Sequence, residues 1–401
     1  MIVLKYIRYV VLVVSYVGIG LGYLPGLRMN RATIALVGAA CLILLRLVDL
    51  KEAWQAIDYK TIIFLLSMMV INANLTCSGF FQLALDYLIR ITRSPLGLLV
   101  ALTFGSGILS ALFLNDTIAI VLTPLTLGLT TALSLKPIPY LLALAGATNL
   151  GSVATITGNP QNILIGSFSG ISYLNFAKSL TPVALISLVV QVGLLWFLYP
   201  DVRSTKPCSI DNSPRYRVFK PLLTKSLLVS AGLLVAFLVG IEPSLATLIA
   251  ASLLLVTRRV KPQKILQQVD WNLLVMFSGL FILTLGTQKL GFLGLFTGLV
   301  HTHLGLLGGS VVLSNLISNV PAVLLLQHLI PHGDTQSWLL LAAASTLAGN
   351  LTLLGSVANL IVAEAVAKEG HHLTFWEHLR FGLPLTLLTS AIAYFWIQWL
   401  A

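Results

Sequence analysis

The stretch NLGSVATITGNPQNILIG (residues 149–166) has a counterpart in TLAGNLTLLGSVANLIVA (residues 346–363). Each stretch begins with apolar and small residues, passes through a polar break and ends in a short apolar run. The breaks are GNPQN (residues 158–162) and GSVAN (residues 355–359). Such residues interrupt a helix, and free backbone groups at membrane depth are tolerated only where they line a cavity or are buried in protein. Paired broken segments in two halves of a chain indicate a transporter's binding site.

The composition is that of a polytopic membrane protein. Of the 401 residues, 57% are hydrophobic and 9% are charged, against about 25% charged in a typical soluble domain. The net charge of +11 comes from basic residues in short connectors, which fits membrane topology better than nucleic-acid binding. Cys41, Cys77 and Cys208 are scattered and form no disulfide or metal pattern. The first apolar run is interpreted as a retained helix, not a signal peptide.

The apolar runs predict an all-α fold with ten membrane segments, two of them broken. The segments of the first half are residues 9–24, 31–48, 61–77, 138–168 and 181–199. Those of the second half are residues 222–240, 244–257, 271–288, 336–367 and 379–399. Two further apolar stretches with polar tips, residues 96–134 and 304–331, are each either two spans or one re-entrant hairpin.

The two halves match in sequence. At an offset of 212 residues, Asp58 pairs with Asp270 and Arg46 with Arg258. At an offset of 197, Asn162 pairs with Asn359. Matches between rare polar residues indicate a duplication, which predicts a first repeat over residues 1–200, a linker over 201–221 and a second repeat over 222–401.

Charge predicts the topology. With five crossings in each half the repeats are inverted, and a cytoplasmic linker over residues 201–221 places 17 of the 24 Lys and Arg residues inside. In that count Arg31 belongs to a cytoplasmic connector. Both termini are then external, in a multi-pass protein of the plasma (inner) membrane.

The polar tips of the two apolar stretches are expected to begin short helices. The first tip holds Asn115, Asp116 and Thr117, and the second holds Ser318 and Asn319. Together with the half-helices of the breaks, they offer four helix ends whose free N–H groups and dipoles could bind an anion without Lys or Arg. The alternative is ordinary capping and tight packing of small residues. The substrate-binding candidates are Asn115, Thr117, Gly158, Asn159, Asn162, Ser318, Asn319, Gly355, Ser356 and Asn359.

Asp116 is the one acid in these motifs, and an acid at such depth indicates a functional site. It could carry a proton or bind a cation, or it could simply cap a helix. Its counterpart in the second half is Val320. The candidates for the coupling ion, Na⁺ or H⁺, are Asp116 with oxygens of Asn115, Thr155 and Asn159, and more weakly Glu364.

The sequence does not indicate metal binding, ATP drive or hydrolytic catalysis. His371, His372 and His378 could suggest a metal site, but they fall in a predicted cytoplasmic connector, so no metal is expected. The sequence has no Walker A motif, Ser-His-Asp arrangement or HExxH motif, so neither ATP drive nor hydrolysis is indicated. We expect no catalytic residues and no cofactor.

These motifs resemble the ion transporter superfamily, and within it the citrate-transporter-like and arsenite-efflux-pump-like permeases. The similar stretches are LNDTIAIVLTP, TITGNPQNILIG, SNVPAVLLL and AGNLTLLGSVANLIVAE, in the order the family has them. The resemblance implies inverted repeats, each with a re-entrant hairpin and a broken helix, in a homodimer that works by an elevator motion. The tips of dicarboxylate–sodium symporters both read Ser-Asn-Thr, whereas these read Asn-Asp-Thr and Ser-Asn-Val, more like the arsenite branch.

The sequence therefore favours an ion-coupled secondary transporter of a small anion or oxyanion, such as arsenite, antimonite, a carboxylate or an inorganic anion. Its partners are that substrate and the lipid bilayer, with no nucleic acid. A Na⁺/H⁺ antiporter that uses Asp116 is the alternative, and an anion channel with the same helix ends is a third interpretation.

Overall fold

The structure is a computed structural model that describes residues 2–91, 94–205, 218–257, 260–368 and 373–400. These residues form an almost entirely helical protein without a β-strand. Seven of the helices are long and apolar enough to cross a membrane by length and composition. The expected all-α membrane fold is therefore confirmed. Most of the predicted linker, residues 206–217, lies outside the described residues.

The helices follow the predicted segments closely. The first half contains α1 (Ile2–Leu21), α2 (Arg31–Leu44), α3 (Leu50–Ala56), α4 (Tyr59–Ser78), α5 (Phe80–Ile91), α6 (Pro95–Leu112), α7 (Asn115–Ala132), α8 (Pro137–Ser152), α9 (Pro160–Ser169) and α10 (Tyr173–Leu198). The second half contains α11 (Lys220–Val239), α12 (Pro243–Leu255), α13 (Pro262–Leu266), α14 (Trp271–Lys289), α15 (Thr297–Val300), α16 (His303–Ile317), α17 (Asn319–Leu326), α18 (Thr335–Leu347), α19 (Val357–Lys368) and α20 (Phe375–Trp399).

Both predicted breaks exist, but they begin earlier than expected. The first covers residues 153–159, since Pro160 and the residues after it already belong to α9. The second covers residues 348–356 and contains two short 3-10 turns. Proline causes the first shift, because it cannot continue a helix but suits the first turn of the next one. The residues after each break therefore start a helix.

The two polar-tipped stretches are helical hairpins. In the first, α6 and α7 are joined at Phe113 and Leu114. In the second, α16 and α17 are joined at Ser318. The prediction that both tips start helices is confirmed.

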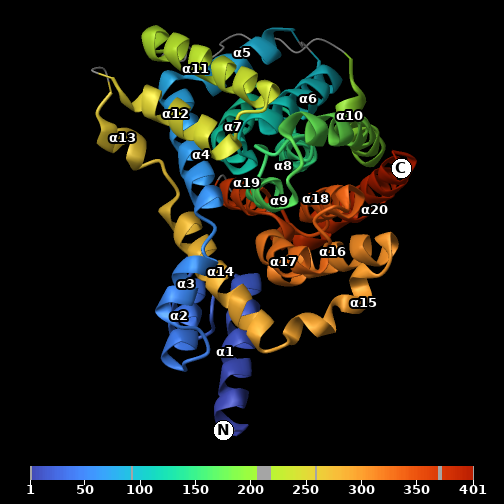
Figure 1. The fold of residues 1–401 in the computed structure, drawn as a ribbon. Helices are drawn as coiled ribbons and strands as arrows, with labels where there is room; N and C mark the ends of the chain where they lie inside the picture. The colour runs from blue at the N-terminus through green and yellow to red at the C-terminus, as the bar shows by residue number, and fades with distance from the viewer. Residues whose placement is uncertain (1, 92–93, 206–217, 258–259, 369–372, 401) are drawn as a thin grey trace.

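Figure 1 shows how the helices are arranged. Helices α2, α3, α4, α12 and α13 lie on the left, α10, α16, α18 and α20 lie on the right, and α7, α14 and α19 lie near the middle. Contacts run crosswise between the halves of the chain: α2 packs against α14, and α4 packs against α12. The second arm of each hairpin packs against the half-helix that follows the other break, as α7 does on α19 and α17 on α9. Both tips and both breaks are thereby brought together.

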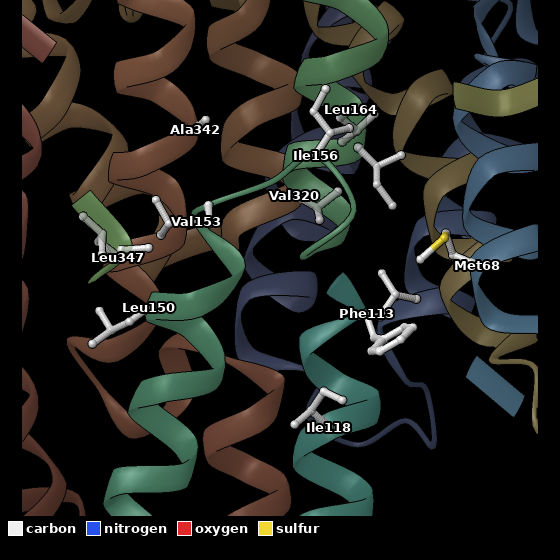
Figure 2. Packing of buried hydrophobic residues seen from close by; sticks show 14 of the residues in the cluster. Met68, Phe113, Ile118, Leu150, Val153, Ile156, Leu164, Val320, Ala342 and Leu347 are labelled. Carbon is white, nitrogen blue, oxygen red and sulfur yellow. The ribbon is translucent and has the colours of Figure 1, made fainter. Parts of the chain in front are cut away.

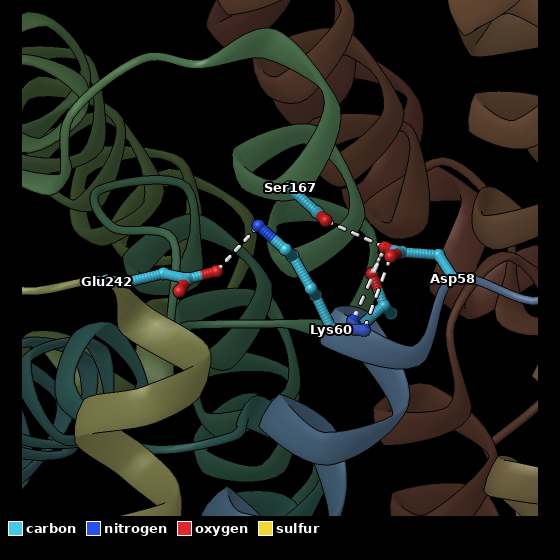
Figure 3. Close-up of polar contacts among 5 residues, drawn as sticks. Asp58, Lys60, Ser167 and Glu242 are labelled. Carbon is cyan, nitrogen blue, oxygen red and sulfur yellow. Dashed lines mark hydrogen bonds and ion pairs between the residues drawn. The ribbon is translucent and has the colours of Figure 1, made fainter.

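Equivalent polar contacts join the helix ends of the two crosswise pairs. Lys60 at the start of α4 forms an ion pair of 2.7 Å with Glu242, which precedes α12, and its hydrogen bond holds the pKa of Glu242 below the usual range (Figure 3). At the same offset of 212 residues, Asn30 Nδ2 lies 3.4 Å from Asn272 Oδ1 and joins α2 to α14. The two crosswise helix pairs are thus held at equivalent places.

Buried apolar side chains surround the first break. Figure 2 shows apolar side chains from α4 (Met68), the first hairpin (Phe113, Ile118), the first broken segment (Leu150, Val153, Ile156, Leu164) and α17 and α18 (Val320, Ala342, Leu347). All of them are less than a tenth exposed. Non-helical backbone at membrane depth has to be surrounded by protein, and this packing provides that surrounding.

Candidate functional site

The first hairpin tip is anchored to the first break. The backbone N–H of Asn115 donates to the carbonyl of Gly158 at 2.9 Å, and Asn115 is only 5% exposed. Leu114 occupies the cap position of α7, with no capping bond from a side chain, and Asp116 follows in the first turn. The alternative in which Asp116 is the N-cap is therefore wrong. Within the described residues its carboxylate makes no capping bond, so it is available for other contacts near the helix N-terminus.

The second tip carries backbone strain. Ser318 has φ +79° and ψ 156°, values that side-chain-bearing residues rarely adopt and that cost about 1–3 kcal/mol. Asn319 then begins α17, and Pro321 lies in its first turn as predicted. Strain of this kind occurs preferentially at ligand clamps and switch regions, which supports a functional role for the tip.

The two predicted break asparagines hold the unwound backbone in the same way. Asn162 Nδ2 donates to the carbonyls of Ser152 and Thr155, both at 2.9 Å. Asn359 Nδ2 donates to the carbonyls of Gly349 at 2.8 Å and Thr352 at 3.1 Å. The acceptors lie ten and seven residues before the asparagine in both cases, so the two breaks share the same asparagine contacts.

Replacing either asparagine with leucine removes the Nδ2 group that donates both hydrogen bonds to the break. Because each buried carbonyl left without a partner costs about 1–3 kcal/mol, we expect the break to repack and transport to fall by about tenfold or more. Uptake into vesicles by Asn162→Leu and Asn359→Leu tests this, once size-exclusion profiles show that the variants are assembled. Asn175→Leu, at an exposed residue of α10, is the matched control. Parental uptake by both variants would contradict the assignment.

Asn149 connects the broken segments. Its Nδ2 donates to Asn350 Oδ1 at 2.8 Å, while its Oδ1 accepts from Ser356 Oγ at 3.0 Å and from Asn115 Nδ2 at 3.3 Å. One carboxamide of α8 thus links the half-helix before the first break to the second break and to the first tip. Sequence reasoning missed Asn149 and Asn350. Both stand in the duplicated stretches, but ahead of the residues expected to interrupt the helix.

A cavity of about 60 Å³ lies between the two tips, the start of α9 and the second break; we call it the central cavity. The predicted residues Asn115, Asp116, Ser318, Asn319, Gly355 and Ser356 are all among its lining. The carboxamide oxygens Asn115 Oδ1 and Asn319 Oδ1, one per tip, are buried without a hydrogen-bond partner in the described part of the chain. A buried polar atom without a partner needs an explanation, and a ligand that donates hydrogen bonds supplies one.

Arg31 also lines the central cavity, which the sequence did not predict. An anion site without Lys or Arg was expected, with Arg31 in a cytoplasmic connector, but Arg31 is the first residue of α2 and lies beside both tips. Helix α2 packs along α14, and Leu273 and Met276 of α14 line the same cavity, so the first residue of α2 reaches it. Arg31 Nε donates to the carbonyl of Ile19 at 3.1 Å, which fixes the side chain. Arg31 and Asp116 are the charged residues among those lining the cavity.

Three other predicted residues hold the first break in place without lining the central cavity. Asn159 caps α9 by accepting from the Asn162 N–H at 2.8 Å. The hydroxyl of Thr155 donates to the carbonyl of Ala111 in the first hairpin. Gly158 is required because a Cβ there would stand 2.4 Å from the carbonyl oxygen of Ser152. These residues shape the break and are not among those lining the central cavity.

Two predicted residues lie elsewhere. Thr117 faces a second cavity, described below, and its hydroxyl accepts from Asn72 Nδ2 at 3.3 Å. Glu364 is exposed on α19 and is absent from the lining of the central cavity.

His378 is buried, contrary to the cytoplasmic connector expected for it. It lies on α20, 1% exposed, with Nε2 3.1 Å from the carbonyl oxygen of Asn350 in the second break. The cause is tertiary: Gly382, one turn later, lets α20 approach so closely that a Cβ there would meet the Asn350 oxygen at 2.1 Å. His371 and His372 lie outside the described residues. The described residues hold no group of His, Cys, Asp and Glu suited to a metal.

Known proteins resemble this chain over nearly its whole length. A silicon efflux transporter, LSI3 of Oryza sativa subsp. japonica, is 31% identical over 92% of each chain. The inner membrane protein YbiR of Escherichia coli K12 is 30% identical over 86% of this chain and 89% of that protein. A putative transporter arsB of Dictyostelium discoideum is 26% identical over 91% of this chain and 87% of that protein.

The fold is similar to that of a solved transporter. The crystal structure of the Alcanivorax borkumensis YdaH transporter, described as having an unusual topology, matches 99% of this chain with a TM-score of 0.58 at 14% identity. The model of the citrate transporter family matches residues 10–348. The relatives named for a function are transporters, not enzymes, as the sequence predicted. The chain is a multi-pass membrane transporter and belongs to the citrate transporter family.

Proposed function

We propose that this protein is an ion-coupled secondary transporter of a small oxyanion or its undissociated oxyacid. The observation that carries the proposal is the central cavity, where both tips, the second break and the start of α9 meet Arg31 and Asp116. A guanidinium donates to a ligand oxygen, while a carboxylate and two carboxamide oxygens accept from ligand hydroxyls. A small oxyacid that keeps at least one O–H group satisfies both requirements.

The size of the cavity supports a small substrate. At about 60 Å³ it has room for about two water molecules, since each takes up about 30 Å³ in the liquid. A tetrahedral or pyramidal inorganic oxyacid is of that size, whereas citrate is several times larger. The name of the rice relative refers to silicon efflux, which makes silicic acid and arsenous acid the first compounds to test.

The transport cycle we propose is the elevator motion of an inverted-repeat homodimer in the plasma (inner) membrane. The crosswise helix pairs and the matching break contacts support two related repeats, residues 1–200 and 222–401, joined by the linker 201–221. In the second hairpin, the 15-residue α16 spans about 22 Å at 1.5 Å per residue, less than the bilayer core of about 30 Å. The second arm, α17, has only 8 residues, and two arms that are both shorter than the core support a re-entrant hairpin.

Reconstituted protein tests the proposal. We expect proteoliposomes to accumulate arsenite or silicic acid when a Na⁺ or pH gradient is applied, and not to accumulate citrate. Only downhill flux, insensitive to any ion gradient, would indicate a channel instead. Sodium-dependent proton movement without any added oxyacid would indicate the antiporter, although a fixed guanidinium disfavours a bare cation in the central cavity.

Cysteine labelling tests the topology. The linker contains the native Cys208, while Cys41 and Cys77 are partly buried. In a variant with Cys41→Ser and Cys77→Ser, we expect an impermeant maleimide to label Cys208 from the cytoplasmic side only, because the positive linker is retained inside. A further Cys208→Ser change provides the background signal. Labelling from outside in intact cells would reject the proposed orientation.

A further inference from the structure

A second cavity of about 320 Å³ lies beside the central one; we call it the side cavity. Helix α4, the start of α7 and the segment leading into α14 surround it. Its charged residues are Asp116 and Asp270. Asp116 lines both cavities, so it stands between them with Arg31 on one side and Asp270 on the other.

The side cavity also contains a buried carboxamide oxygen without a partner. Asn72 of α4 is 1% exposed and lines the cavity. Its Nδ2 donates to Thr117 Oγ1 at 3.3 Å, but its Oδ1 has no hydrogen-bond partner in the described chain. Two carboxylates, a hydroxyl and this carboxamide form a set of oxygen donors, the ligand type that hard cations prefer.

Asp270 has a counterpart in the first half, Asp58, whose carboxylate makes more hydrogen bonds within the protein. Asp58, the counterpart of Asp270, accepts from the N–H groups of Lys60 and Thr61, from the Thr61 hydroxyl and from Ser167 Oγ (Figure 3). For Asp270, the hydrogen bond found among the described residues is the one from the Leu273 N–H at 3.1 Å. Both carboxylate oxygens of Asp58 thus accept hydrogen bonds from the protein, whereas Asp270 keeps one carboxylate oxygen available for a ligand.

We propose that the side cavity holds the coupling cation, bound between the carboxylates of Asp116 and Asp270 with oxygens of Asn72 and Thr117 as neutral ligands. The inference rests on the proposed function, since it names the site where the driving ion of that transport binds. A bound cation neutralises Asp116, which otherwise attracts Arg31 across the central cavity. Cation and substrate therefore influence each other through one carboxylate.

The central test is Asp270→Asn. Asparagine caps a helix as well as aspartate does, so α14 should form normally while the charge is lost. Coupling between two ligands of one protein is typically worth about 5- to 150-fold in affinity, and we expect the variant to bring that factor close to one. The measurement is arsenite and silicic acid affinity of the purified protein, with and without Na⁺ and across a pH series. The series separates a sodium ion from a proton as the cation.

Two further variants make the test specific. Asp58→Asn makes the same chemical change at the equivalent cap and should keep the parental ion dependence. Thr117→Val removes a proposed neutral ligand at nearly constant volume and should weaken the ion dependence without abolishing substrate binding. Parental ion dependence in Asp270→Asn would overturn the inference. A parent protein whose substrate binding and transport respond to neither ion would instead overturn the proposed function.

Discussion

Arg31→Gln should weaken substrate binding by about 10- to 150-fold, since a hydrogen bond to a charged group contributes about 1.5–3 kcal/mol. Arg31 is the positive residue among those lining the central cavity, and its position is fixed by the Ile19 carbonyl. Its removal also leaves Asp116 without an opposing charge in a confined site. Both effects reduce the affinity for an oxyanion or a polarised oxyacid.

Titration calorimetry with arsenite and silicic acid measures this loss. Arg28→Gln, three residues earlier and exposed, changes the net charge equally and should bind as the parent does. Arg31→Lys keeps the charge but not the planar fork of donors, so its affinity should fall between the two. Equal affinities for Arg31→Gln and Arg28→Gln would remove Arg31 from the substrate site.

Asp116→Asn should abolish accumulation driven by an ion gradient while downhill exchange of substrate continues. The change keeps the size of the side chain and removes the charge that both cavities share. The cap of α7 is Leu114, so loss of a capping carboxylate cannot explain a defect. The assay compares gradient-driven uptake with exchange at equal ion concentrations, in the same reconstituted vesicles.

The double variant Arg31→Gln with Asp116→Asn tests whether the two residues interact. If Arg31 and Asp116 interact across the central cavity, Arg31→Gln with Asp116→Asn should lose less binding energy than the sum of the single losses, because neither charge is left unopposed. Additive losses would show that the two residues act independently. Undiminished gradient-driven uptake by Asp116→Asn would move the coupling ion to another site.

Local features of the chain were predictable. The membrane segments, the two hairpins and the two breaks follow from runs of apolar residues and from Gly, Pro and carboxamides that interrupt them. The matched offsets placed Asn162 and Asn359 as clamps of equivalent breaks, and the structure places their side chains on equivalent carbonyls. Such contacts span ten residues or fewer, so the pattern in the sequence and the contact in space nearly coincide.

Contacts across the chain needed the tertiary structure. Asn149 meets Asn350 although 201 residues separate them, and Arg31 reaches a cavity otherwise lined by residues 115–357. Nothing in the local sequence of Arg31 distinguishes it from the basic residues of a connector. Its position depends on how α2 packs along α14, and that packing is set by the shapes of two whole helix surfaces. The sequence by itself thus determined the membrane fold, the segments that form the site and its acid Asp116, whereas only tertiary packing decided that Arg31 faces it.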